Sequence, residues 1–218
     1  MQLAAGSIAF VAAVFCFAAP SLAQQSPPIR IRGTIQAVDL PILTVKSKTG
    51  ETQKVRIADN ARVAAMVKAT VADLKPNSYV GVTSVPAADG GETAYEVHIF
   101  LEERRGAGEG RNPFDRGPQS MMTNGAANLQ PAAPKPQAPG TKVQVEDATG
   151  QMLTVTYKGQ EAKIALTPET IIAAYATGSD RSEIKPGTNV TVQANRHEDG
   201  SLEASAVIYG RDGFTPPI

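Results

Sequence analysis

Apolar and polar residues alternate in short runs along most of the chain, and turn residues separate the runs. The first run, IRIRGTIQAV, places Ile29, Ile31 and Ile35 on one face of an extended segment and polar residues on the other. A period of two residues is typical of a strand with one buried face. Later runs of the same kind flank the turn residues at 49–50 and at 89–91. This arrangement predicts two β-hairpins in the first half of the chain.

The second half of the chain repeats the pattern of the first half at a shift of 110 residues. The tripeptide LTV at 43–45 falls on LTV at 153–155, and LKP at 74–76 falls on IKP at 184–186. Anchors that keep one order and one spacing indicate an internal duplication. Strands of the second repeat are therefore expected at 141–146, 153–157, 162–166, 171–175, 190–195 and 202–209.

Five or six short strands in about 70 residues, ordered as hairpin, crossover and hairpin, are typical of a small closed or nearly closed barrel. A small two-sheet sandwich is the alternative. The predicted fold is all-β, with two similar OB-fold-like barrels at 29–101 and 141–212. Between them, residues 102–140 lose the strand pattern and are rich in Gly and Pro, so they are expected to form a flexible linker.

The first 23 residues have features of a secretory signal peptide. An apolar run at 8–19 is followed by small residues at Ser21 and Ala23, which predicts cleavage after Ala23 and export to the periplasm. No Lys or Arg precedes this run, and a retained anchor is the alternative, although the run is shorter than the roughly 20 residues of a membrane span. The single cysteine, Cys16, leaves with the signal. The mature chain is expected to have no stable membrane span.

Each repeat resembles small β-barrel domains of unknown function in exported bacterial envelope proteins. Their rough pattern, G-x-I…LTV…LKPG…DG, is matched by Gly33, Ile35 and the anchors described above. Asn77 replaces the glycine of this pattern in the first repeat, and a left-handed turn tolerates Asn. Relatives of this kind are sometimes labelled as components of metal ABC transporter permeases. The resemblance implies OB-fold-like barrels and makes metal handling an alternative function.

Two histidines are the candidate metal ligands. His98 is expected to point outward from a strand, and His197 to lie in a hairpin loop. A transition-metal site needs several converging ligands. The position equivalent to His98 in the second repeat is Ile208, so the duplication does not repeat the histidine. Two surface histidines are the favoured interpretation, with metal binding as the alternative.

Charge and composition argue against several other classes of function. The formal net charge is zero, which argues against a dedicated nucleic-acid binder. The mature chain would have no cysteine nucleophile, and the sequence assigns neither histidine a catalytic partner, so an enzyme is a distant third hypothesis. The sequence GAGEG at 106–110 lacks the GK[ST] ending of a phosphate-binding loop. No cofactor is expected.

The first three strands of the first repeat are expected to present six cations on their outward face. These residues are Arg30, Arg32, Lys46, Lys48, Lys54 and Arg56. An ordinary solvated surface is the simpler interpretation, because Lys and Arg usually lie outside. The functional interpretation is a face that binds an acidic partner protein, an anionic envelope component or the acidic second repeat. The sequence thus predicts a non-catalytic binding or envelope-support protein.

Overall fold

The computed structural model describes residues 28–131 and 150–218, and its regular elements are strands and three short 3-10 turns. No α-helix occurs in these residues, so the predicted all-β class is confirmed. No helix of the described ranges is long and apolar enough to cross a bilayer. The expected signal peptide at 1–23, the strand expected at 141–146 and the second part of the expected linker lie outside the described residues.

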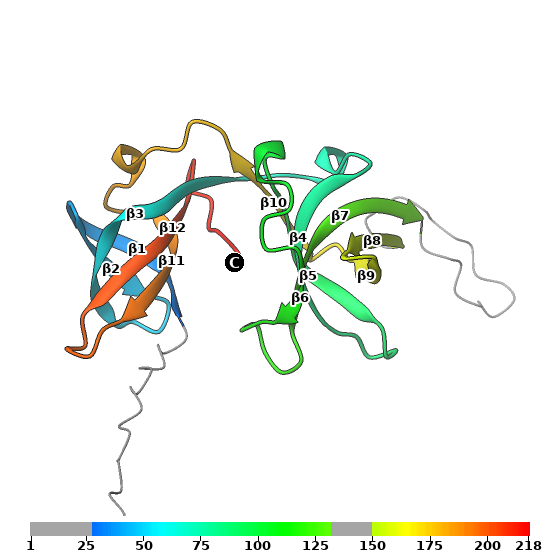
Figure 1. Ribbon diagram of the computed structural model, residues 1–218, viewed down its shortest axis with the longest axis horizontal. Helices are drawn as coiled ribbons and strands as arrows, with labels where there is room; N and C mark the ends of the chain where they lie inside the picture. Colours follow the sequence, from blue (N-terminus) through cyan, green and yellow to red (C-terminus); the bar gives the residue numbers. More distant parts are fainter. Residues whose placement is uncertain (1–27, 132–149) are drawn as a thin grey trace, which may run out of the picture.

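Five strands form a closed barrel, here called barrel A. They are β1 (Ile29–Asp39), β2 (Ile42–Ser47), β3 (Thr52–Lys68), β11 (Asn189–Arg196) and β12 (Leu202–Gly210). Antiparallel pairs join β3 to β2, β2 to β1, β1 to β11 and β11 to β12, and a parallel pair between β12 and β3 closes the ring (Figure 1). The inward positions of the alternating runs, such as Leu43, Val55 and Val207, fill its core.

Five other strands form a second ring, here called barrel B. They are β4 (Ser78–Pro86), β5 (Glu92–Ile99), β7 (Met121–Pro131), β8 (Gln151–Tyr157) and β9 (Gln160–Leu166). Antiparallel pairs connect β5, β4, β7, β8 and β9 in that order, and a single parallel pair between Thr93 and Ala165 closes the ring. Val82, Leu153 and Ile164 are fully buried in its core.

One long strand and the C-terminal segment connect the two barrels. The 17-residue strand β3 leaves barrel A and pairs with β10 (Ile171–Ala176), which also pairs in parallel with β5 of barrel B. The segment at 214–218 lies between the barrels, where Ile218 packs against Met66, Ala173 and Ile208 (Figure 1). The strands of both barrels therefore belong to one continuous sheet.

The strands of each barrel come from both halves of the chain, which differs from the expectation of one barrel per repeat. Barrel A combines β1–β3 with β11 and β12, and barrel B combines β4 and β5 with β7–β9. The expected flexible linker is also wrong in part, because it contains β6 (Gly110–Pro113) and β7. Buried positions alternate along β7, but they are occupied by Thr123, Gly125 and Ala127. These small or weakly apolar residues conceal the strand pattern.

Two glycines indicate that β7 occupies the same position in barrel B as β1 occupies in barrel A. A Cβ atom on Gly33 of β1 would lie less than 3.0 Å from the carbonyl oxygen of Lys46, and one on Gly125 of β7 would also lie less than 3.0 Å from the carbonyl oxygen of Thr156. Lys46 and Thr156 are related by the shift of 110 residues. Gly33 and Gly125 are not related by this shift, so the matching contacts relate the two barrels, and the duplication stays an interpretation of the sequence.

Candidate functional site between the barrels

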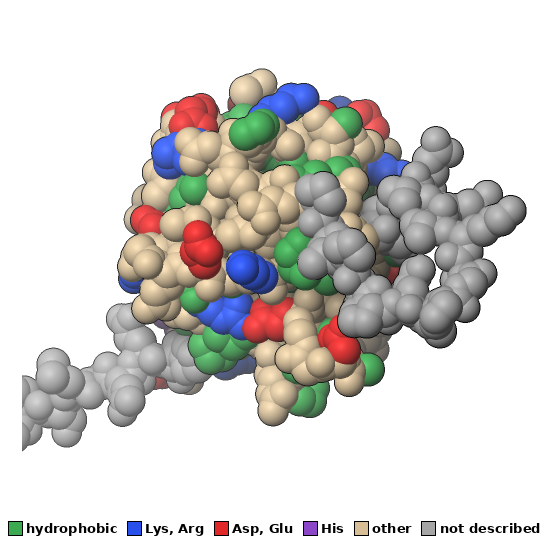
Figure 2. All heavy atoms as spheres, turned by 90° about the vertical axis from the view of Figure 1, so that its right-hand side faces the viewer, with side chains coloured by type: hydrophobic (Ala, Val, Ile, Leu, Met, Phe, Trp, Pro, Cys, Tyr) green, Lys and Arg blue, Asp and Glu red, His purple; other side chains and the backbone are tan. Residues whose placement is uncertain are grey.

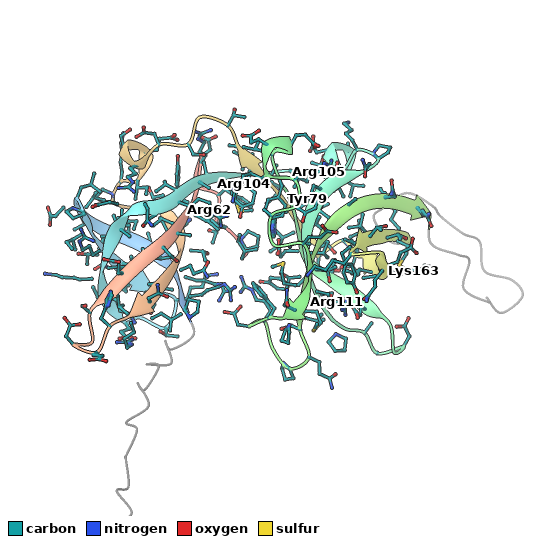
Figure 3. All side chains as sticks on the ribbon, viewed as in Figure 1. Arg62, Tyr79, Arg104, Arg105, Arg111 and Lys163 are labelled. Atoms are coloured by element: carbon teal, nitrogen blue, oxygen red, sulfur yellow. The ribbon has the colours of Figure 1, made fainter. Side chains whose placement is uncertain are left out.

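A cleft between the barrels brings together buried polar side chains, half-buried aromatic rings and exposed arginines. Its main cavity, of about 400 Å³, is lined by residues of both barrels, including Thr191 of barrel A and His98 and Asn124 of barrel B. A second cavity of about 280 Å³ shares Arg62 and Arg104 with the first. Figure 3 shows these two arginines at the junction of the barrels, near the long strand β3.

The barrel B wall of the cleft is formed by the outward face of β5. Val97 points into the core of barrel B, so its neighbours Glu96 and His98 point out of the barrel. Both are nevertheless buried, with 0% and 3% of their surface exposed. The outward direction predicted for His98 is confirmed, but its predicted surface exposure is wrong, because other elements cover this part of the strand.

Glu96 holds the imidazole of His98 in one orientation. The hydroxyl of Thr83 donates to Oε1 of Glu96 over 2.6 Å, and Nδ1 of His98 lies 3.2 Å from Oε2. A carboxylate accepts hydrogen bonds, so in the neutral imidazole the proton is on Nδ1 and the lone pair is on Nε2. Since His98 lines the cavity, this arrangement can place an acceptor or a base at the wall of the cleft.

Gly81 allows two polar side chains to converge at this wall. In the sheet it lies between His98 on β5 and Asn124 on β7. A Cβ atom at Gly81 would lie less than 3.0 Å from Nε2 of His98 and 2.7 Å from Oδ1 of Asn124. The absence of a side chain at Gly81 thus leaves room for both polar atoms over one point of the sheet.

The carboxamide of Asn124 has a defined orientation. Its Nδ2 donates to the carbonyl oxygens of Gly108, over 3.2 Å, and of Ala107, over 3.4 Å. The Oδ1 atom therefore lies on the side of Gly81. It is buried, and it accepts no hydrogen bond from any residue that the structure describes. The site therefore contains a buried acceptor without a donor from the described part of the chain.

Aromatic rings form the apolar part of the cleft. Phe100 and Tyr175 stack with ring centroids 5.3 Å apart, and the ring of His98 meets each of them edge-on. Burial raises the pKa of Tyr175 to about 12, and the negative charge of Glu96 acts in the same direction. Its hydroxyl therefore stays neutral at physiological pH, and the wall offers an uncharged surface beside the two arginines.

Arg62 and Arg104 are the cations of the cleft that remain available for a ligand. Each lines both cavities, and neither forms an ion pair with another residue within the described ranges. Arg30 also lines the main cavity, but its guanidinium lies over the ring of Phe114, 4.4 Å from the centroid. It also lies 3.6 Å from Asp115. An anion in the cleft would therefore meet two guanidinium groups that have no ion-pair partner in the part of the chain that the structure describes.

Two of the six predicted basic-face residues, Arg30 and Arg32, lie on the side of barrel A that faces barrel B. Arg32 of barrel A donates two hydrogen bonds, of 3.0 and 2.8 Å, to the carboxylate of Asp115, which lies in the loop between β6 and β7. Partial burial would raise the pKa of Asp115, but the hydrogen bond and charge of Arg32, together with Arg30, outweigh it and lower the pKa. Arg30 and Arg32 point out of barrel A, as predicted, but this side of barrel A faces the β6–β7 loop of barrel B.

The other four predicted residues lie on the outside of barrel A. Arg56 pairs with Glu203 over 2.8 Å. Lys46, Lys48 and Lys54 are exposed and form no ion pair within the described ranges. Anion binding at this face stays a prediction. On barrel B, acidic and basic side chains are interspersed over the visible part of the outer face (Figure 2).

The structure does not bring the two candidate metal ligands together. His197 lies in the turn between β11 and β12 and is exposed, beside Lys54 and Arg56 on the outside of barrel A. His98 is buried in the cleft. No group of three His, Cys, Asp or Glu side chains suited to a metal ion occurs in the described residues. Metal handling stays a prediction that no observed cluster supports.

Most residues of the cleft are absent from the candidates that the sequence indicates. Arg62, Arg104, Asn124 and Tyr175 come from four separate elements, and only the fold brings them together. One local signal exists. Glu96 and His98 are separated by one residue, so a single strand presents a carboxylate and an imidazole on the same face.

Comparisons with protein-family models, with curated proteins and with solved structures find no match to this chain. The resemblance to tandem barrel domains of envelope proteins therefore stays a prediction. What can be inferred about function rests on the geometry of the cleft.

Proposed function

We propose that this chain is a non-catalytic periplasmic binding protein whose ligand is a small organic anion, held in the cleft between the barrels. The observation that carries this proposal is the position of Arg62 and Arg104. Both line the two adjoining cavities, beside the stacked rings of Phe100 and Tyr175, without an ion-pair partner in the described residues. Export rests on the signal-like features of residues 1–23.

The chemistry of the cleft suits an anion with an apolar portion. A guanidinium binds a carboxylate through parallel hydrogen bonds, which gives both affinity and orientation. The aromatic pair can contact the apolar portion of the same molecule. The main cavity, of about 400 Å³, lies within the range of about 300–1,000 Å³ that is usual for small-molecule sites.

Isothermal titration calorimetry with 3-phenylpropionate, which combines a carboxylate with an aromatic ring, tests this proposal by measuring the dissociation constant. The cleft variant is Arg62→Gln/Arg104→Gln. A matched control, Lys46→Gln/Lys48→Gln, also removes two cations, but from the exposed face of barrel A. We expect the cleft variant to bind at least tenfold more weakly, and the control to stay within twofold of the parent chain.

Salt provides a second criterion. Charge-based binding should weaken as the ionic strength rises from 0.05 to 0.5 M, because added ions screen the arginines. Normal binding by the cleft variant, together with lost binding in the lysine control, would move the site to the basic face of barrel A. That face, with its three exposed lysines, is the second candidate for binding an acidic partner protein or an anionic envelope component. Lack of binding by the parent chain to 3-phenylpropionate and to its hydroxy and amino derivatives would contradict the proposal.

A further inference from the structure

We infer that the anion in the cleft also carries a hydrogen-bond donor, a hydroxyl or an ammonium group, which Oδ1 of Asn124 accepts beside His98. This inference rests on the proposed function and specifies the chemical class of its ligand. The ligand class is a small hydroxy acid or amino acid with an apolar substituent.

The first observation is the unpaired acceptor of Asn124. Two backbone carbonyls accept the amide protons, so the carboxamide cannot turn its nitrogen toward the cleft without losing both bonds. Its Oδ1 accepts nothing from the described residues although it is buried. Buried polar atoms are nearly always hydrogen-bonded in folded proteins, and an unpaired one is costly. A donor on the ligand would satisfy this atom.

The second observation is the side chain that adjoins this acceptor. Nε2 of His98 approaches the same point above Gly81. With Nδ1 hydrogen-bonded to the buried carboxylate of Glu96, the neutral imidazole presents the lone pair of Nε2. Two acceptors from neighbouring strands therefore converge, and a hydroxyl or an ammonium group can donate to one or both of them.

A third polar atom faces the main cavity from the other barrel. Thr191 is 3% exposed and lines the cavity, and its Oγ1 has no hydrogen-bond partner among the residues that the structure describes. In the sheet of barrel A, Thr191 lies between Arg32 and Ile208, as Gly81 lies between Asn124 and His98 in barrel B. Polar atoms without a partner in the described residues therefore line the cleft from both barrels.

The test compares four carboxylates that share one skeleton: 3-phenylpropionate, 3-phenyllactate, 3-hydroxy-3-phenylpropionate and phenylalanine. The first has no donor, the next two place a hydroxyl at either carbon, and the last carries an ammonium group. Dissociation constants are measured by titration calorimetry on the parent chain. We expect at least one donor-bearing compound to bind tenfold or more tightly than 3-phenylpropionate, because a site with a buried acceptor rejects an analogue that lacks the donor. The preferred compound distinguishes a hydroxyl from an ammonium ligand.

Two variants assign the preference to Asn124. In Asn124→Ala, the dissociation constants of 3-phenylpropionate and of the preferred donor-bearing compound should differ by less than twofold. Met122→Ala, which alters a side chain lining the same cavity on the same strand without removing an acceptor, should preserve the ratio of these two constants. A ratio below twofold in the parent chain overturns the inference whether or not the variants fold. If 3-phenylpropionate binds at the arginines without any donor preference, the inference fails and the proposed function stands. If none of the four compounds binds, both fail.

Discussion

A single methyl group at Gly125 tests whether residues 121–131 form a barrel strand or a linker. Gly125 lies in β7, and a Cβ atom there would lie less than 3.0 Å from the carbonyl oxygen of Thr156 on the neighbouring strand β8. The same atom would lie 3.0 Å from the carbonyl carbon of Thr156. These are backbone atoms of a paired strand, so the clash cannot be relieved by a change of side-chain rotamer.

The expected effect of Gly125→Ala follows from two opposing contributions. In a strand without steric conflict, replacing Gly by Ala stabilises the fold by about 0.5–1 kcal/mol, because the unfolded chain loses conformational freedom. Overpacking of a closely packed site costs about 1–3 kcal/mol, and a contact with backbone belongs at the upper end of this range. The net prediction is a loss of about 2 kcal/mol from a total stability of about 5–15 kcal/mol.

Urea denaturation followed by circular dichroism measures this loss. The control is Gln130→Ala, which changes an exposed residue of the same strand and should alter the free energy of unfolding by less than about 0.5 kcal/mol. A flexible linker predicts no loss of stability for Gly125→Ala, since alanine would restrict the folded and the unfolded chain alike. A variant as stable as the parent chain, or more stable, would refute the assignment of β7 to barrel B.

Two further predictions concern charged contacts. The hydrogen bond from Arg211 lowers the pKa of Glu183 to about 2, from an ordinary value of 4.5. A lowered pKa stabilises the folded state above pH 4.5, and this contribution is lost as the pH falls toward 2. Thermal melts between pH 4.5 and pH 2 should therefore show a larger loss of stability for the parent chain than for Glu183→Gln. Asp115→Asn should cost less than about 1 kcal/mol at low salt, because the link to Arg32 is partly exposed. The difference should shrink at high salt, and a loss of several kcal/mol would show that this link is essential to the packing of the barrels.

The strands that the sequence predicts correctly are those whose inward residues are clearly apolar. Alternation of Leu and Val in β2 and β8, and the turn residues that bound the hairpins, are sufficient to predict these strands and their neighbours. The hydrophobic pattern does not predict β7, because the inward residues of this strand include Thr123, Gly125 and Ala127. Glycine there reflects the close approach of two backbones, and a hydrophobic pattern does not detect this requirement.

The exchange of strands between the halves of the chain could not be predicted from alternation. Strands of both repeats have the same period and similar inward residues, so either partner would satisfy the pattern equally well. The consequences for the site are direct. The sequence predicts that His98 faces solvent and that Arg30 and Arg32 belong to an open basic face, because the outward positions of a barrel strand are usually exposed. In the exchanged arrangement these outward faces meet, and they form the cleft.

The most direct test of the proposed site uses the two histidines of the chain, one in the cleft and one on the outer side of barrel A. Their side-chain nitrogen resonances are followed by NMR while 3-phenylpropionate is added. The proposal predicts that the resonances of His98 shift and saturate with the ligand, while those of His197 stay in place. A shift at His197 with none at His98 would place the anion beside Lys54 and Arg56, and would contradict a binding site between the barrels.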